Sequence, residues 1–218
     1  PARAPLEAGG IKTAIYEQYP AENTDLNVIA QKLINSHPDA VILGTSSIND
    51  SVKYISYFKA QHFNPKLLIA TSGPDQGALF TKAIGGAKYA EGIFIANGGW
   101  WPTVKTYQND YFVPAFTKKF GGSSSDIGSD AVQAFSIGQV LEQAVNQTHS
   151  LDNGKIMQLM RSGAVFRTLQ GAVKFGSDGQ NTLALPYLFQ WQNNNLVPVY
   201  PSSQAQANPE YPKHNWGA

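Results

Sequence analysis

Two polar segments carry side chains that could bind a ligand, and each follows a run of apolar residues. The first is residues 45–50, Thr-Ser-Ser-Ile-Asn-Asp. The hydroxyls of Ser46 and Ser47 could bond a polar ligand directly or through water. The same residue types cap helices, so Ser47, Asn49 and Asp50 have an alternative role at the start of the next helix. We favour that role for Asn49 and Asp50, and both roles stay open for Ser46.

The second segment is residues 71–76, Thr-Ser-Gly-Pro-Asp-Gln, which again follows an apolar run. Asp75 fits the N-cap position of a helix that would begin at Gln76. Further along, Trp100 and Trp101 follow a Gly-Gly pair. Paired indoles could wall an apolar or aromatic ligand, or pack at a crossing between two domains.

Residues for catalysis or metal binding do not form a recognisable set. The four histidines follow helix ends or lie in the C-terminal tail, and none has His-x-x-x-His spacing. The chain has no cysteine, no Gly-x-Ser-x-Gly and no Walker lysine loop. We therefore predict no catalytic residue, no metal and no cofactor, and we expect a protein that is not an enzyme.

The charge balance excludes further classes of partner. Sixteen basic and fifteen acidic residues give a net charge of +1, and charged residues make up only 14% of the 218 residues. Binding to nucleic acid or to an anionic membrane needs an excess of Lys and Arg. No segment approaches the roughly 18 apolar residues of a membrane span. We expect no nucleic-acid partner and no membrane insertion of this segment.

The elements that must position the polar segments alternate along the first part of the chain. Apolar residues recur at helical spacing after Asp25, and continuous apolar runs precede each polar segment. This alternation predicts right-handed βαβ units and a parallel sheet. The expected strands are residues 12–16, 40–44, 67–70 and 91–96, and the expected helices are residues 26–34, 51–61 and 76–84.

The pattern changes after residue 97, which we interpret as a crossing between domains. Residues 201–218 show no periodicity and are expected to form a surface tail. Between them we expect a helix over 104–120, helices that begin near Ser129 and after Asp152, a strand over 171–175, and a hairpin of 187–192 with 196–200.

The order of several short pieces carries a resemblance to a known family. These are Pro-Asp-Ala-Val-Ile-Leu-Gly at 38–44, Gly-Pro-Asp at 73–75, Asp-Ala-Val-Gln-Ala at 130–134 and Leu-Gln-Gly-Ala-Val-Lys-Phe at 169–175. With their spacing over residues 8–201, the chain resembles the type I periplasmic solute-binding proteins of ABC transporters, in the branched-chain amino acid (Leu/Ile/Val) group.

The resemblance implies an α/β fold of two Rossmann-like lobes with parallel central sheets. Such proteins are longer than this chain, so we expect a C-terminal portion with a truncated first lobe. The expected division is residues 1–95 as most of the second lobe, 98–184 as the later part of the first lobe, 185–201 as a return to the second lobe, and 202–218 as an irregular tail.

The resemblance also implies a function and a site. The chain would bind a small amino acid, or a related amide or aromatic acid, by hinge closure, and deliver it to ABC transporter permease subunits. In amino-acid binders of this kind a carboxylate after Gly-Pro pairs with the ligand's ammonium, and Asp75 matches that position. The ligand-binding residues expected are Ser46, Ser47, Gly73, Asp75 and Trp100.

The implied location is periplasmic or extracellular, with a lipid anchor as an option for the full-length protein. The alternative function is a ligand-sensing regulatory domain of the same fold that acts on a partner protein. An α/β enzyme is the third hypothesis, and the lack of a base, nucleophile or metal set speaks against it.

Overall fold

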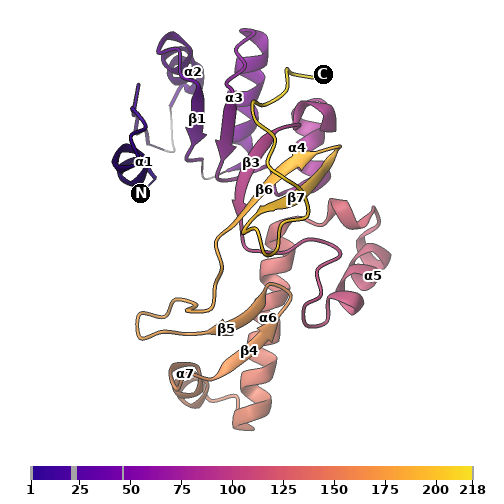
Figure 1. Cartoon of the computed structure of the whole chain (residues 1–218). Helices are drawn as coiled ribbons and strands as arrows, with labels where there is room; N and C mark the ends of the chain where they lie inside the picture. Colours follow the sequence, from indigo (N-terminus) through magenta and orange to yellow (C-terminus); the bar gives the residue numbers. More distant parts are fainter. Residues whose placement is uncertain (1, 21–23, 46, 218) are drawn as a thin grey trace.

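The computed structural model describes residues 2–20, 24–45 and 47–217, and the chain forms two halves (Figure 1). The sheet half comprises the described residues up to 97 together with residues 187–217. The helical half comprises residues 98–186. The chain passes from the sheet half to the helical half after residue 97 and returns before residue 187, so two crossings connect them.

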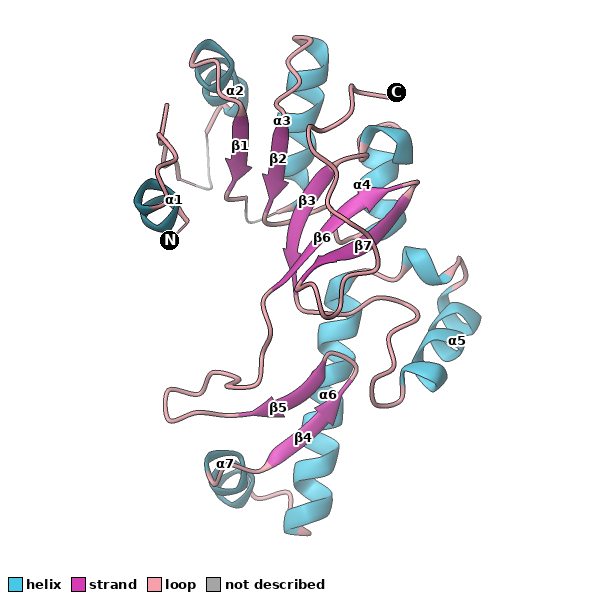
Figure 2. Cartoon of the chain, viewed as in Figure 1, coloured by secondary structure: helices cyan, strands magenta, loops and turns pink. Residues whose placement is uncertain are grey.

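One mixed sheet of five strands forms the centre of the sheet half, in the order β1-β2-β3-β6-β7. The strands are β1 (Ala40–Leu43), β2 (Leu67–Ala70), β3 (Ile93–Asn97), β6 (Tyr187–Gln192) and β7 (Asn195–Tyr200). The first three run parallel, and the β6–β7 hairpin adds two antiparallel strands (Figure 2). The predicted α/β class, the parallel strands and the hairpin are confirmed, but the sheet as a whole is mixed rather than parallel.

Helices α2 (Leu26–Asn35), α3 (Ile48–Ala60) and α4 (Gly77–Ala83) pack on this sheet through their buried apolar residues. A short 3₁₀ turn follows at Ala87–Tyr89, and α1 (Arg3–Ala8) near the N-terminus has no buried residue. Asp25 is the N-cap of α2, and its Oδ1 accepts from the backbone N–H of Asn27 at 3.0 Å. Phe58 and Phe80 are fully buried in the core, and each such side chain stabilises the fold by about 2 kcal/mol.

The helical half is built around one long helix. Its elements are α5 (Asn109–Phe120), a 3₁₀ turn at Ser124–Asp126, α6 (Ser129–Thr148), α7 (Asn153–Arg161), β4 (Val165–Thr168) and β5 (Gly171–Lys174). The β4–β5 hairpin packs on α6 through Phe166 and Ala144, which are both fully buried. β4 was not predicted, because Val-Phe-Arg-Thr is not a continuous apolar run like those that predicted β1 and β2.

Two other expectations about the elements are wrong. Residues 12–16 form no strand, and no described segment pairs with them in a ladder. The run 40–44 is buried on one face only: Val41 and Leu43 are buried, whereas Ile42 is 42% exposed. β1 is an edge strand, and the helices that pack with Val41 and Leu43 cover only their face.

An apolar cluster joins the two halves. Ile95 and Phe189 come from the sheet, and Trp100, Phe112 and Val132 come from the helical half. The parallel strands end at this junction, so the loops after β1, β2 and β3 face the helical half (Figure 1). In open α/β sheets this edge is where ligands bind.

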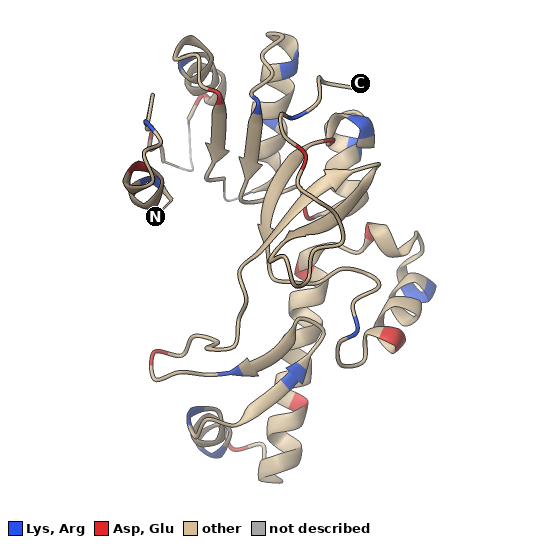
Figure 3. Cartoon of the chain, in the orientation of Figure 1, with Lys and Arg blue, Asp and Glu red and all other residues tan. Residues whose placement is uncertain are grey.

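The C-terminal tail, residues 201–217, has no helix or strand and lies against the sheet half. Gln190 Nε2 donates to the carbonyl oxygen of Glu210 at 2.9 Å, and Trp216 Nε1 donates to that of Phe63 at 2.8 Å. Charged residues are scattered along the elements of both halves (Figure 3). Within the described ranges, none of the helices has the length and apolar character needed to cross a membrane.

Candidate functional site

The loops after β1 and β2 are fastened to one another by hydroxyl groups. Thr71 Oγ1 donates to the carbonyl oxygen of Thr45 at 2.9 Å, and the hydroxyls of Thr45 and Ser51 lie 2.8 Å apart. Thr45 and Ser51 are buried. The parallel register of β1 and β2 brings these segments together, although the sequence separates them by more than twenty residues.

Ser47 is the N-cap of α3, and its hydroxyl oxygen accepts from the backbone N–H of Asp50 at 3.2 Å. The capping alternative therefore holds for Ser47, while its own hydroxyl proton is not used in that bond. Asn49 and Asp50 lie in the first turn of the helix rather than at its cap. Ser46 lies outside the described residues.

The Gly-Pro-Asp segment after β2 is a fixed loop. Gly73 has a φ of +111°, a conformation that L side chains rarely adopt, and it is buried. Trp191 Nε1 donates to the carbonyl oxygen of Pro74 at 2.8 Å. The indole of Trp191 belongs to the core, and it also holds this loop against the β6–β7 hairpin.

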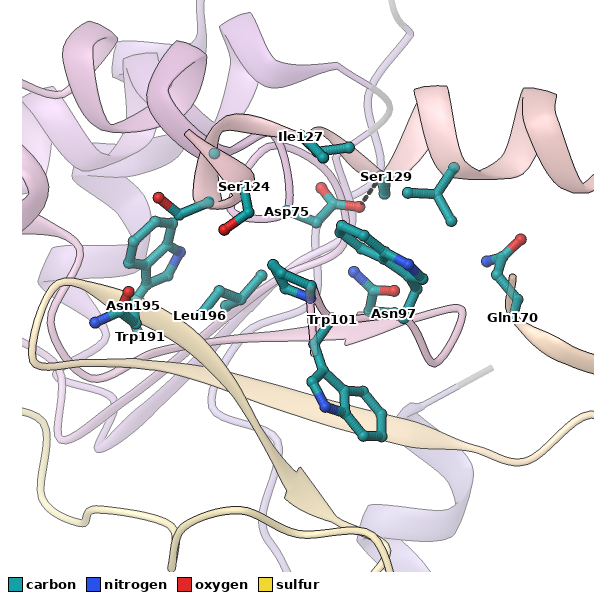
Figure 4. Close-up of a pocket in the computed structure, with 15 residues that line it drawn as sticks. Asp75, Asn97, Trp101, Ser124, Ile127, Ser129, Gln170, Trp191, Asn195 and Leu196 are labelled. Carbon is teal, nitrogen blue, oxygen red and sulfur yellow. Dashed lines mark hydrogen bonds between the residues drawn. The ribbon is translucent and has the colours of Figure 1, made fainter. Parts of the chain in front are cut away.

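Asp75 does not cap α4. The N-cap of that helix is Gln76, which makes no side-chain capping bond, so the capping alternative for Asp75 is wrong. Its carboxylate turns instead toward the helical half, where Oδ2 accepts from the hydroxyl of Ser129 (Figure 4). Its second oxygen, Oδ1, is buried and has no hydrogen-bond partner among the described residues.

The environment of Asp75 disfavours its charged form. Burial raises the pKa of the Asp75 carboxyl above its ordinary value, and the nearby Asp130 adds to the rise. The hydrogen bond from Ser129 acts in the opposite direction but is the smaller effect. A carboxylate desolvated in this way gains strongly from any cation or hydrogen-bond donor that reaches it.

A small, partly open cavity of about 80 Å³ lies beside Asp75, between the two halves (Figure 4). Its walls bring Asp75 together with Trp100, as the sequence analysis grouped them, but Ser47 and Gly73 do not line it. The other lining residues are Gly77, Asn97, Trp101, Pro102, Ser124, Ser125, Ile127, Ser129, Val132, Gln170, Trp191, Asn195 and Leu196.

Both tryptophans of the crossing are buried, with 7% of each exposed. Trp100 Nε1 donates to Asn109 Oδ1 at 2.8 Å, and its ring meets Phe112 edge-on at 6.1 Å between centroids. Trp101 packs against Tyr187 and Phe189. Both side chains thus pack between the halves, and both also contribute to the cavity wall.

Sequence reasoning missed several residues of this cavity. Ser129 was noted only as a helix start, and Asn97, Gln170 and Asn195 were not singled out. Asn97 carried a usable signal, because it is the last residue of a buried parallel strand. Ser129 and Gln170 carried none, because only the tertiary fold brings them to Asp75 and to the crossing.

The histidines behave as helix-end residues, as expected. His37, His62 and His149 follow α2, α3 and α6 in the left-handed conformation, with φ between 48° and 53°. Across the residues that the structure describes, no group of three or more His, Asp or Glu side chains is placed to hold a metal ion.

Comparison with known proteins identifies the family. The sequence model of the family described as "Periplasmic binding protein" matches residues 1–195. The chain belongs to the periplasmic binding protein family. Because these are binding proteins and not enzymes, the expectation of a non-enzymatic protein is confirmed, and the family name implies an extracytoplasmic location.

Individual proteins of this periplasmic binding protein family resemble the chain over nearly its whole length. It is 26% identical over 212 residues to "Leu/Ile/Val-binding protein homolog 8" of Brucella abortus. The aligned region covers 95% of this chain and 52% of that relative. The chain thus spans about half the length of the curated relatives it matches.

Two solved structures share its fold. One is the branched-chain amino acid transporter substrate binding protein LivJ of Streptococcus pneumoniae in complex with isoleucine. The TM-score is 0.66 at 18% sequence identity, and the match covers 90% of this chain and 51% of that one. The other is a solute binding protein of an ABC transporter from Rhodopseudomonas palustris in complex with p-hydroxybenzoic acid. The TM-score is 0.64 at 18% sequence identity, and the match covers 99% of this chain and 56% of that one. The type I periplasmic-binding-protein fold expected from the sequence is confirmed.

Proposed function

We propose that this chain is the later part of the solute-binding component of an ABC importer. Its family membership and the names of its relatives support the proposal. In this proposal, residues 1–95 and 185–201 belong to the second lobe, residues 98–184 belong to the first lobe, and residues 202–218 are an irregular tail. The complete gene product, which we call the whole protein, would supply the rest of the first lobe.

The ligand would be a small amino acid or a related amide or aromatic acid. It would bind between the lobes, and hinge closure would enclose it by shifting the population from open to closed forms. Ser46, Ser47, Gly73, Asp75 and Trp100 are the ligand-binding residues of this proposal. Ser47 retains a hydroxyl proton to donate, Asp75 retains its buried Oδ1, and the indole of Trp100 forms an apolar wall.

One observation carries the proposal beyond family membership. Asp75 lines a cavity at the carboxyl edge of the parallel strands, where the two halves meet, and its desolvated Oδ1 has no hydrogen-bond partner among the described residues. None of the described residues that line this cavity is Lys, Arg or His. An ammonium group of a ligand would supply the missing positive partner.

The permease subunits of an ABC transporter would recognise the closed form. Export to the periplasm or the cell exterior, with or without a lipid anchor, belongs to the same proposal. The names of the relatives favour transport over the ligand-sensing alternative, since they describe binding and transporter proteins.

Isothermal titration calorimetry of the whole protein against a panel of amino acids, their amides and aromatic acids tests the proposal. We expect binding to at least one class, and a loss of affinity of ten-fold or more for an amino acid when Asp75 becomes Ala. A wild-type protein that binds no member of the panel would refute the importer function.

A further inference from the structure

The strongest polar contact between the two halves involves Asp75 and Ser129. The hydroxyl of Ser129 donates to Asp75 Oδ2, and the backbone N–H of Ser129 donates to the backbone carbonyl oxygen of Asp75 at 3.2 Å (Figure 4). Gln76 Nε2 completes the arrangement by donating to Ser129 Oγ at 3.1 Å. Three hydrogen bonds thus connect the loop after β2 with the first residue of α6.

The backbones approach closely at the same place. A Cβ atom added to Gly77 would lie 2.7 Å from the carbonyl oxygen of Ser125, and one added to Gly128 would lie 2.7 Å from Gln76 Oε1. Each segment therefore has a glycine where it faces the other. The start of α4 thus lies directly against the backbone of the 3₁₀ turn that precedes α6, and Gly128 leaves room for the Gln76 side chain that reaches Ser129.

Burial strengthens this contact. Ser129 is only 7% exposed, and Asp75 Oδ1 is shielded from solvent. Hydrogen bonds to a charged group are stronger in such a low-dielectric setting than in water. The carboxylate also sits at the amino-terminal end of α6, where the helix dipole favours negative charge.

The location gives the contact a mechanical consequence. The halves are connected covalently by the two crossings that flank residues 98–186. Rotation about those crossings would change the separation of Asp75 from Ser129, because the two residues lie on different halves. The hydrogen bonds therefore favour the relative orientation seen in the structure over any orientation that separates them.

We propose that Asp75 and Ser129 form a latch between the lobes, and that this latch sets the balance between open and closed forms of the binding protein. The inference rests on the proposed function, because it treats the two halves as lobes. Ser129 is a positioning residue in this scheme. One carboxylate serves both purposes: Oδ2 holds the lobe orientation, while Oδ1 has no hydrogen-bond partner among the described residues and is left for the ligand.

The test compares Ser129→Ala with a matched control, Ser136→Ala, in the whole protein. Ser136 lies on the same helix and is equally buried at 7% exposure, and its hydroxyl has no hydrogen-bond partner among the described residues. The described chain lacks cysteine, so spin labels can be attached at Val28→Cys on α2 and Leu151→Cys after α6. Any other cysteine of the whole protein is replaced by Ser. Those positions are 54% and 82% exposed and lie at opposite ends of the molecule (Figure 1).

Pulsed electron paramagnetic resonance of the ligand-free protein then reports the distribution of interlobe distances. Losing a hydrogen bond to a charged group changes an equilibrium constant by roughly ten-fold. We expect Ser129→Ala to change the ratio of the two lobe orientations by about that factor, which adds a second peak to the distance distribution. Ser136→Ala should give the wild-type distribution. Identical distributions for Ser129→Ala and the wild type would overturn the latch.

A second pair of variants covers the case in which Ser129→Ala does not fold. Ser129→Thr keeps the hydroxyl and Ser129→Val has the same shape without it, so the latch predicts the wild-type distribution for Thr and the shifted one for Val. Equal distributions for this pair would overturn the latch. Because the distances are measured without ligand, a wild type that binds nothing refutes the proposed function alone, and unchanged distances with normal binding refute the latch alone.

Discussion

Asp75 is an acid whose surroundings oppose its ionisation. Burial raises its pKa, and the rise exceeds the lowering that the Ser129 hydroxyl produces. The folded state therefore binds this proton more tightly than the unfolded state does. Such a group contributes stability at low pH, and this contribution is lost as the pH rises through the pKa that the group has in the folded state. Asp130 is the charged neighbour that acts in the same direction as burial.

This linkage predicts the behaviour of Asp75→Asn. The amide keeps an oxygen to accept from Ser129 and carries no charge, so the variant should be more stable than the wild type by about 1 kcal/mol at pH 8. The difference should shrink as the pH falls toward 4. Thermal unfolding from pH 4 to pH 8 measures it. A wild type that gains stability over Asp75→Asn with rising pH would contradict the assignment.

Lys213 in the tail is a second buried charge, with only 4% of its surface exposed. Burial lowers its pKa to about 8. Its ammonium donates to the carbonyl oxygen of His214 at 2.8 Å and lies 3.6 Å from the centre of the Trp216 ring. No carboxylate of the described residues forms a salt bridge with it. Keeping this group charged therefore costs stability below about pH 8.

We expect Lys213→Met to raise the free energy of unfolding by about 1 to 3 kcal/mol at pH 7. The advantage should fade as the pH rises from about 8 toward the unfolded lysine pKa near 10.4, because the wild-type amine is then neutral in both states. Urea denaturation at pH 7 and pH 10 measures the two values. Lys12→Met, at an exposed position, is the control and should change little at either pH.

The residue scale also shows where sequence reasoning stopped. The type of Asp75 and its place after a buried strand could be read from the sequence. The caps at Asp25, Ser47 and Asp152 are local too, since each bonds a backbone N–H two or three residues further on. The partner of Asp75 lies 54 residues further along the chain. No periodicity connects the two, so only the tertiary fold could disclose the pair.

At the scale of elements, α4 fits closely against the backbone of the 3₁₀ turn Ser124–Asp126. Gly77 has a φ of +54°, and a Cβ there would lie 2.7 Å from a backbone oxygen, which cannot move aside as a flexible side chain could. Gly138 on α6 is the opposite case, because a Cβ there meets nothing within 4 Å and the φ is ordinary.

The two glycines give a matched prediction. Gly77→Ala should destabilise the protein by about 1 to 3 kcal/mol through overpacking and backbone strain. Gly138→Ala should stabilise it by up to about 1 kcal/mol, because alanine favours the helix. Thermal unfolding of both variants checks the signs, and a neutral Gly77→Ala would mean that α4 and the turn separate readily.

The elements most local in sequence were the best predicted. α2, α3 and the β6–β7 hairpin follow from periodicity, caps and turn residues. The strand expected over residues 12–16 failed, because a strand is completed by a partner and the ladder of the sheet begins at β1. Sequence patterns report a segment's own preference and not the presence of its neighbour.

At the scale of the whole molecule, the exposed apolar surface of the helical half calls for a partner. Ile137 and Leu141 on α6 are 62% and 46% exposed, and β1 leaves one edge of the sheet unpaired within the described chain. Exposed strand edges and apolar helix faces favour association between chains. The relatives are about twice as long as this chain, and under the proposed function the rest of the first lobe would cover this face of α6.

The last prediction compares the 218-residue chain with the whole protein. Alone, the chain should self-associate and bind ligand poorly, since one wall of the proposed cleft is absent from it. Ile137→Gln together with Leu141→Gln should reduce that association, because both changes remove apolar surface from one face of α6. In the whole protein, the same pair should instead destabilise the fold by about 2 kcal/mol or more, because buried amides without partners are costly. Sedimentation velocity and thermal unfolding measure the two outcomes. A monomeric chain that binds an amino acid or aromatic acid with micromolar affinity would contradict the division into lobes proposed here.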